Sequence, residues 1–171
     1  MRQGRGRRRL IQFDEVAMRQ VSQDLSMGFR VTIQATGWSM LPLIWDKRDK
    51  LHLAPLTEES IAVGRIVLVC IPPKQHIVHR IAAIDGNRLI LRGDGNAYQQ
   101  EICQREDVLG ELVGIERAGK TYTQCDKLWQ RIERFWPNSP ILRRILLALY
   151  KRLYITKTFR ITSAIKRQHK L

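Results

Sequence analysis

The segment HIVHRIAAIDGNRLILRGDGN, His76 to Asn96, decides the fold class of this 171-residue chain. Two runs rich in apolar and β-branched residues, 76–84 and 88–92, flank the tripeptide Asp85-Gly86-Asn87. Asp-Gly and Gly-Asn pairs between such runs favour a tight turn that joins two antiparallel strands. We therefore predict a β-hairpin here, followed by a second turn at Gly93-Asp94-Gly95-Asn96.

Short runs of the same kind lie on both sides of this hairpin. They cover residues 29–35, 50–56, 65–72 and 108–123, and turn-forming residues such as Pro72-Pro73 separate them. Several short strands with frequent turns indicate a compact, mostly antiparallel β domain. We assign this domain to residues 29–123 and find no internal repeat.

The two ends of the chain have a helical pattern instead. In residues 10–27, positions spaced three and four apart are apolar, and Gly28 follows as a stop signal. This predicted helical stripe consists of Phe13, Val16, Ala17, Val21 and Leu25. We therefore assign residues 1–28 to a basic N-terminus with one amphipathic helix.

Residues 124–171 form a basic, Trp-containing helical extension. A first helical stripe ends at Pro137 and contains Leu128, Trp129, Ile132, Phe135 and Trp136. A second helix is predicted to start with Ser139 as its N-cap and Pro140 in the first helical position. Its apolar stripe contains Ile141, Leu142, Ile145, Leu146, Leu149 and Tyr150. For residues 125–150 we expect such stripes to pack on the β domain.

The net charge of +14 comes from the two ends of the chain. Residues 1–9 contain five arginines and no acid, and residues 124–171 contain twelve Lys/Arg against two acids. The part between them is close to neutral, as in an ordinary globular domain. Basic amphipathic helices favour an anionic membrane surface or an acidic partner. Nucleic acid is not an expected partner, because no groove-reading motif accompanies the charge.

The three cysteines, Cys70, Cys103 and Cys125, have no metal-ligand spacing and are odd in number. We expect all three to be packing residues in a reducing compartment. Neither a secretory signal nor an uninterrupted apolar stretch of membrane-spanning length is apparent. The expected location is cytoplasmic, and peripheral membrane association is left open.

The stretch TGWSMLPLI, Thr36 to Ile44, introduces the candidate chemistry. A serine hydroxyl needs a base to act as a nucleophile, and histidine has a suitable pKa. A carboxylate then orients the imidazole. Ser39 follows a predicted strand, His79 lies within one, and Asp94 lies in a turn, so this set could form a triad. We expect no metal or cofactor, and we treat His52 and His76 as non-catalytic.

Four segments, GWSMLP, GRIVLV, IVHRI and RGDGN, resemble the signal-peptidase clan of serine peptidases in their order along about residues 29–117. That clan includes the LexA-like repressors. Its nucleophile motif Gly-x-Ser-Met-x-Pro is matched by Gly37, Ser39, Met40 and Pro42. Valine-His-Arg, in place of a lysine, resembles the endoplasmic-reticulum and archaeal members, so the resemblance implies Ser39 as nucleophile and His79 as base.

The resemblance also implies a coiled, mostly antiparallel β-sheet peptidase fold of the signal peptidase/LexA type. It implies that a peptide or precursor protein binds in an exposed groove as an added β-strand, with small residues near the scissile bond. Gly37, Trp38, Met40 and Pro42 would then lie beside the substrate, although Trp38 and Met40 could equally pack in the core. The backbone N–H of Ser39 would hold the oxyanion.

One departure affects the third triad member. Where the eukaryotic pattern has a pair of aspartates, this chain has Gln99 and Gln100. Asp94 is then the nearby carboxylate, and it either orients His79 or forms only local hydrogen bonds within its turn.

The first hypothesis for the function is a serine endopeptidase that cleaves a leader or precursor peptide. The second is a catalytically weak or inactive peptide-binding module of the same fold. A LexA-like regulator is the third hypothesis, and it ranks last because residues 1–28 hold one helix at most.

Overall fold

The computed structural model describes residues 15–137, 139–150 and 152. Its secondary structure comprises α1 (Glu15–Ser26), β1 (Val31–Gln34), β2 (Lys50–Ala54), β3 (Ile66–Ile71), β4 (Gln75–Asp85), β5 (Arg88–Arg92), β6 (Glu101–Gln104), the 3₁₀ turn η1 (Arg105–Asp107), β7 (Val108–Arg117), β8 (Lys120–Thr123) and α2 (Lys127–Phe135). Residues 140–150 are also helical. The prediction of a mostly β fold is confirmed.

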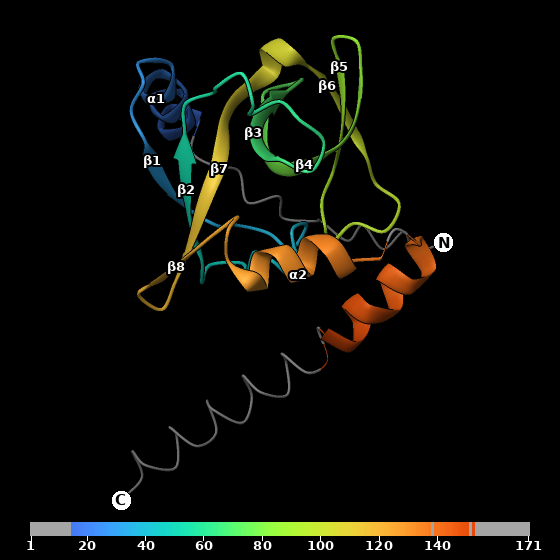
Figure 1. The fold of residues 1–171 in the computed structure, drawn as a ribbon. Helices are drawn as coiled ribbons and strands as arrows, with labels where there is room; N and C mark the ends of the chain where they lie inside the picture. Colours follow the sequence, from blue (N-terminus) through green and yellow to red (C-terminus); the bar gives the residue numbers. More distant parts are fainter. Residues whose placement is uncertain (1–14, 138, 151, 153–171) are drawn as a thin grey trace, which may run out of the picture.

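All eight strands belong to one antiparallel sheet (Figure 1). Its order is β1-β2-β7-β3-β4-β5-β6, and β8 pairs with β7. The predicted hairpin is confirmed, because β4 and β5 pair antiparallel and Asp85 faces Arg88. Gly86 has a φ of +57°, a conformation that favours glycine in such a turn.

Two hydrophobic clusters stabilise the sheet. Side chains of α1, of α2, of residues 35–49 between β1 and β2, and of the sheet share the first cluster, which includes Met18, Leu43, Leu68 and Trp129. The second lies among β3, β4, β5, β6 and the start of β7, and Val67 belongs to it. Neighbouring residues of β3 thus enter different clusters, which explains why this strand is continuously apolar rather than alternating.

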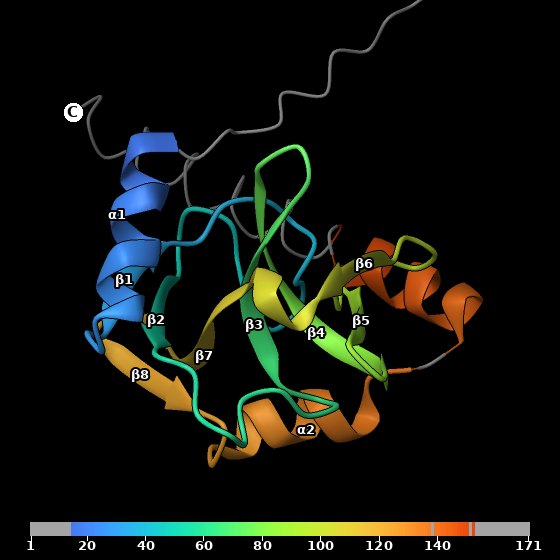
Figure 2. The same ribbon diagram turned by 90° about the horizontal axis from the view of Figure 1, so that it is seen from above.

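The buried side of the N-terminal helix α1 differs from the predicted apolar stripe. In α1, Met18, Val21 and Leu25 are buried, whereas Val16 is exposed. These three residues are themselves spaced three and four apart, so the stripe is rotated from the predicted one; Phe13 lies outside the described residues. α1 contacts β1 and β7, and α2 contacts β8 (Figures 1 and 2).

The C-terminal helices behave in two different ways. Trp129 of α2 is buried in the first cluster, as expected, although Phe135 is exposed. The next helix begins as predicted after Ser139, whose hydroxyl accepts a 3.5 Å hydrogen bond from Leu142 N. The expectation that its apolar stripe packs on the β domain is wrong for five of its six residues, because Ile141, Leu142, Ile145, Leu146 and Leu149 are exposed. Tyr150, the sixth, is half-buried and contacts the Trp45 ring. The inward position is taken by Arg143, which is only 3% exposed.

Cys103 is buried and Cys70 half-buried, but Cys125 is exposed, so packing does not account for Cys125. Within the described residues, no helix has both the length and the apolar character needed to cross a bilayer.

Candidate active site

Ser39 lies in a turn-rich segment, residues 35–49, that connects β1 to β2. Gly37 has a φ of +89°, and its N–H donates a 2.8 Å hydrogen bond to Asp46 Oδ1. The buried Asp49 carboxylate accepts hydrogen bonds from Trp45 N and Arg117 Nε, both at 2.8 Å. The segment is therefore held at both ends, with Ser39 half-buried between them.

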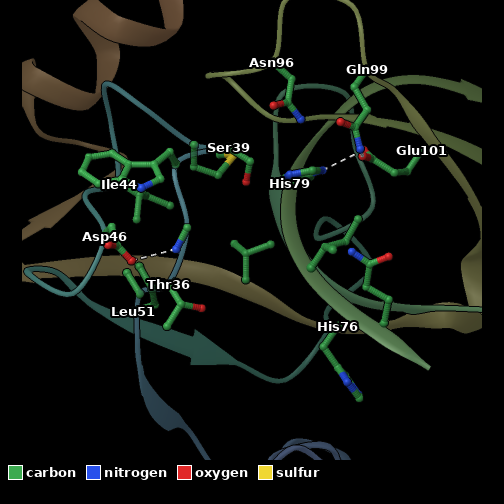
Figure 3. A pocket seen from close by; sticks show the side chains of 17 residues that line it. Thr36, Ser39, Ile44, Asp46, Leu51, His76, His79, Asn96, Gln99 and Glu101 are labelled. Atoms are coloured by element: carbon green, nitrogen blue, oxygen red, sulfur yellow. Dashed lines mark hydrogen bonds and ion pairs between the residues drawn. The ribbon is translucent and has the colours of Figure 1, made fainter. Parts of the chain in front are cut away.

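A pocket of about 360 Å³ opens beside Ser39 (Figure 3). One wall is formed by residues 35–40, and the other by the first half of β4, residues 75–79. Gly37, Trp38 and Met40 line this pocket, and Met40 is also buried in the first hydrophobic cluster. Pro42 is not among the described residues that line it; its carbonyl oxygen accepts a hydrogen bond from Trp45 Nε1 instead.

His79 faces this pocket from β4 and is only 4% exposed. Its Nδ1 lies 2.8 Å from Glu101 Oε2, at the start of β6. Glu101 is itself oriented by Gln99, whose Nε2 donates a 2.8 Å hydrogen bond to Oε1. A carboxylate on Nδ1 fixes the tautomer in which Nε2 is the basic nitrogen. Figure 3 shows the other edge of the ring directed toward Ser39.

Two glycines allow the turn after β5 to approach Ser39 closely. Gly95 N donates a 2.6 Å hydrogen bond to the carbonyl oxygen of Ser39. A Cβ built on Gly93 would lie 2.3 Å from this oxygen and 2.9 Å from His79 Nε2. Both glycines are therefore required, because a side chain at either position would meet the Ser39 segment. The same turn thus contacts the candidate nucleophile and the candidate base.

Ser39 and His79 meet in one pocket without a direct hydrogen bond. Among the described residues, none is formed between Ser39 Oγ and the imidazole. Hydrogen bonds of catalytic groups commonly tighten only when substrate is bound. Ser39, His79 and Glu101 thus border one pocket, and they are the residue types of a Ser-His-carboxylate triad.

The expected contact between Asp94 and His79 is not formed. Asp94 pairs with Arg80 instead, through Nε–Oδ1 and Nη2–Oδ2 contacts of 3.0 and 2.8 Å. Side chains of neighbouring residues in a strand point to opposite faces of the sheet. His79 therefore contacts Glu101 on one face, and Arg80 pairs with Asp94 on the other. Burial disfavours the guanidinium, but the hydrogen bonds and charge of Asp94 prevail and raise the pKa of Arg80 above its ordinary value.

Glu101 is the functional candidate that sequence reasoning missed. It is the first acidic residue after Asp94 and directly follows Gln99-Gln100, the departure noted above. The position of this acid was therefore visible in the sequence. Its partner was not, because the contact depends on how β6 aligns with β5 and β5 with β4.

Neither His76 nor His52 is directed at Ser39. His76 lines the far end of the pocket and points away from Ser39 (Figure 3). Burial lowers its pKa, and the charge of Glu15 partly offsets this effect. His52 Nδ1 lies 2.9 Å from Thr32 Oγ1, across the β1–β2 pair.

The C-terminal extension also contacts the turn after β5. Trp136 Nε1 donates a 2.7 Å hydrogen bond to the carbonyl oxygen of Asp94. Arg143 Nη1 donates to the carbonyl oxygens of Asn96 and Gly93, at 3.1 and 3.5 Å. Burial, and next the charge of Arg92, lower the pKa of Arg143 from its ordinary value. Sequence reasoning did not anticipate these contacts between residues far apart in the chain.

No protein-family model matches the chain, and neither does any curated protein. Among the described residues, no group of three or more His, Cys, Asp or Glu is placed to bind a metal ion.

Proposed function

We propose that the chain is a serine endopeptidase of the signal-peptidase type, with Ser39 as nucleophile, His79 as general base and Glu101 as the orienting carboxylate. The observation that carries this proposal is the 2.8 Å contact between His79 Nδ1 and Glu101, on an imidazole that faces Ser39. The roles of Ser39 and His79 come from the resemblance of the sequence to signal peptidases. The role of Glu101 comes from its contact with His79 Nδ1.

In the proposed reaction, Ser39 Oγ attacks the scissile carbonyl carbon while its proton passes to His79 Nε2. The oxyanion is held by the backbone N–H of Ser39, and the side-chain amide of Asn96 lines the same pocket and can share this role. The C–N bond then breaks, and His79 gives the proton to the leaving amine. Water, activated by His79, attacks the acyl-enzyme, and Ser39 regains its proton.

The strand pairing supports an extended peptide as the substrate. Residues 80–85 of β4 pair with β5 on one side, but residues 75–79 pair only with β3 among the described strands. Their other edge borders the pocket, opposite residues 35–39. A peptide added along such an edge gains main-chain hydrogen bonds, and its alternate side chains enter the pocket. We propose a leader or precursor peptide in this position.

The apolar lining suits small aliphatic side chains at the cleavage site. Ala35, Ile44 and Val78 contribute to this lining. The resemblance to signal peptidases implies the same preference.

Cleavage of a peptide library rich in small residues tests the proposal. Wild-type protein should cleave, and Ser39→Ala should lower kcat by at least about 10³-fold, because the nucleophile is lost. Ser26→Ala is the matched control, since the Ser26 hydroxyl is exposed on α1 and, among the described residues, bonds only to Gln23 O. Equal inactivity of wild type and Ser39→Ala toward the library and toward a serine-reactive fluorophosphonate would count against catalysis.

The second candidate function is a peptide-binding module of the same fold. It is favoured by the absence of a direct hydrogen bond between Ser39 Oγ and His79 within the described residues. The presence of Gln99 and Gln100 in place of the family's two aspartates is weaker support for a binding module, because Glu101 provides a carboxylate next to His79. Peptide binding that Ser39→Ala leaves unchanged, together with no cleavage by wild type, would favour this function.

A further inference from the structure

The helix of residues 140–150 packs on the β domain through an unusual side. Arg143 and Leu147 are buried and Tyr150 is half-buried, at positions spaced four and three apart. Arg143 Nε and Nη2 donate to Pro137 O at 3.1 and 3.0 Å, in addition to the contacts with the turn after β5. The Tyr150 ring contacts the Trp45 ring edge-on, with centroids 5.2 Å apart. This inner side is therefore fixed at both ends of the helix.

A different side of the same helix is apolar and exposed. At 100° per residue, its side chains are centred about 135° from those of the inner side. We call it the outer face, and it consists of Ile141, Leu142, Ile145, Leu146 and Leu149, with exposed fractions of 66, 48, 50, 36 and 53%. Five large aliphatic side chains on one exposed helix face are typical of an interaction site rather than of ordinary protein surface.

The charge around the outer face selects among the partners that could cover it. Residues 134–171 contain ten Lys/Arg and no Asp or Glu. A second copy of the chain would bring two such segments together, so self-association through this face is opposed by repulsion. Nucleic acid would match the charge but would leave the aliphatic side chains without stacking partners. An anionic bilayer satisfies both the charge and the apolar surface.

We propose that the outer face docks on an anionic lipid bilayer, with its aliphatic side chains entering the boundary between headgroups and acyl chains. Arg144 is exposed on this helix, Arg152 is exposed just beyond it, and both would contact the phosphates. Since Arg143 joins the helix to the turn that holds Ser39, the bound protein would keep its peptide pocket at a fixed distance from the membrane surface. Binding to the bilayer does not require Ser39 to be catalytically active.

Vesicle co-sedimentation of the full chain tests this inference. Vesicles of phosphatidylcholine with phosphatidylglycerol should bind the wild type, and pure phosphatidylcholine vesicles should bind it much more weakly. The double variant Ile145→Ser/Leu149→Ser should lower the partition coefficient on the anionic vesicles at least about tenfold. All cationic residues remain in this variant, so the loss reports the aliphatic side chains rather than the basic charge.

The double variant Val63→Ser/Ile102→Ser is the matched control. It removes two side chains that are as exposed, at 64 and 54%, but lie outside the helix, and it should bind like the wild type. Circular dichroism should show the same thermal midpoint for all three proteins. If the helical double variant loses helix content, Ile141→Ser tests the outer face with a single change and should lower binding about threefold or more.

Three outcomes would overturn the proposal. Wild-type protein could fail to bind the anionic vesicles, or the helical double variant could bind them as tightly as the wild type, which would assign binding to the charge alone. Sedimentation velocity could also show a wild-type dimer that the double variant converts to a monomer while vesicle binding is unchanged. A second copy of the chain would then be the occupant of the outer face.

Discussion

His79 Nδ1 and Glu101 Oε2 lie 2.8 Å apart although 22 residues separate them in the chain. The contact arises from the sheet, because β6 pairs with β5 and β5 pairs with β4. Glu101 faces Leu91, and Leu91 faces Ile81, two residues after His79. The pairing of β4 with β5 and of β5 with β6 thus places the Glu101 carboxylate beside His79. The turn that follows β5 does not supply this carboxylate.

Glu101→Gln should lower kcat by about 10²–10⁴-fold while changing KM little. The amide can present its N–H₂ to Nδ1 and stabilise the tautomer with the proton on Nε2, which cannot accept a proton from Ser39. Steady-state kinetics on the cleaved peptide measure this effect. Gln99→Ala removes only the hydrogen bond to Oε1 and should cost about tenfold or less. Unchanged kcat in Glu101→Gln would remove Glu101 from the proposed triad.

Asp94→Asn should act mainly on stability. The Arg80–Asp94 pair has side chains that are 14 and 6% exposed, and its loss leaves a nearly buried guanidinium with weaker partners. We expect the free energy of unfolding to fall by about 2–4 kcal/mol, measured by urea denaturation, and kcat to change less than in Glu101→Gln. Asp85→Asn in the exposed hairpin turn is the control. A catalytic defect in Asp94→Asn as large as that of Glu101→Gln, at unchanged stability, would contradict this assignment.

The sequence predicted the parts of the fold that depend on neighbouring residues. The hairpin at Gly86 follows from local turn preference and alternation, and the helix after Ser139 follows from its capping residues. The partners of His79 and Arg80 depend instead on strand register and on the choice between two sheet faces. Sequence spacing could not assign Asp94 to Arg80 and Glu101 to His79.

The orientation of the helix of residues 140–150 could not be predicted from the sequence either. Its periodicity correctly separates an apolar side from Arg143, but periodicity does not say which side faces the protein. Here the inner side meets the carbonyl oxygens of Pro137 and Asn96, which need donors. A guanidinium supplies several N–H groups in a fixed plane, so an arginine can occupy a position where an aliphatic residue was expected.

Gly93→Ala should disrupt both candidate catalytic residues. The added Cβ would lie 2.3 Å from Ser39 O, far inside van der Waals contact, so the Ser39 segment or the turn must move. We expect about 1–3 kcal/mol of destabilisation and a large loss of cleavage. At Gly114 the nearest atoms would lie 3.4 Å from the new Cβ, so Gly114→Ala should retain activity. Equal activity of these two variants would show that the close approach at Gly93 is not needed.

The buried thiol of Cys103 should make the stability of the protein depend on pH in the alkaline range. Burial, with a smaller effect of Asp107, raises the pKa of this thiol to about 11. As pH rises, the Cys103 thiol loses its proton in the unfolded chain from its ordinary pKa of about 8.5 upward, before it does so in the folded protein. The free energy of unfolding therefore falls progressively between about pH 8.5 and about pH 11. Urea denaturation at several pH values should show a smaller alkaline loss of stability in Cys103→Ala than in Cys125→Ser, since Cys125 is exposed. Identical pH profiles would contradict the shifted pKa.

Arg143 should act as a positioning residue for Ser39. Its guanidinium donates to Asn96 O and Gly93 O, and the intervening Gly95 N–H binds Ser39 O, so loss of the guanidinium loosens the turn that holds the serine. Arg143→Gln should lower kcat about tenfold with a smaller change in KM, and Arg143→Lys should recover part of the loss because it keeps a cationic donor. The exposed neighbour provides the matched variant Arg144→Gln, which should retain wild-type kinetics. A purely structural role would instead lower the thermal midpoint in Arg143→Gln while the kcat of the folded fraction stays unchanged, and that result would refute the positioning role.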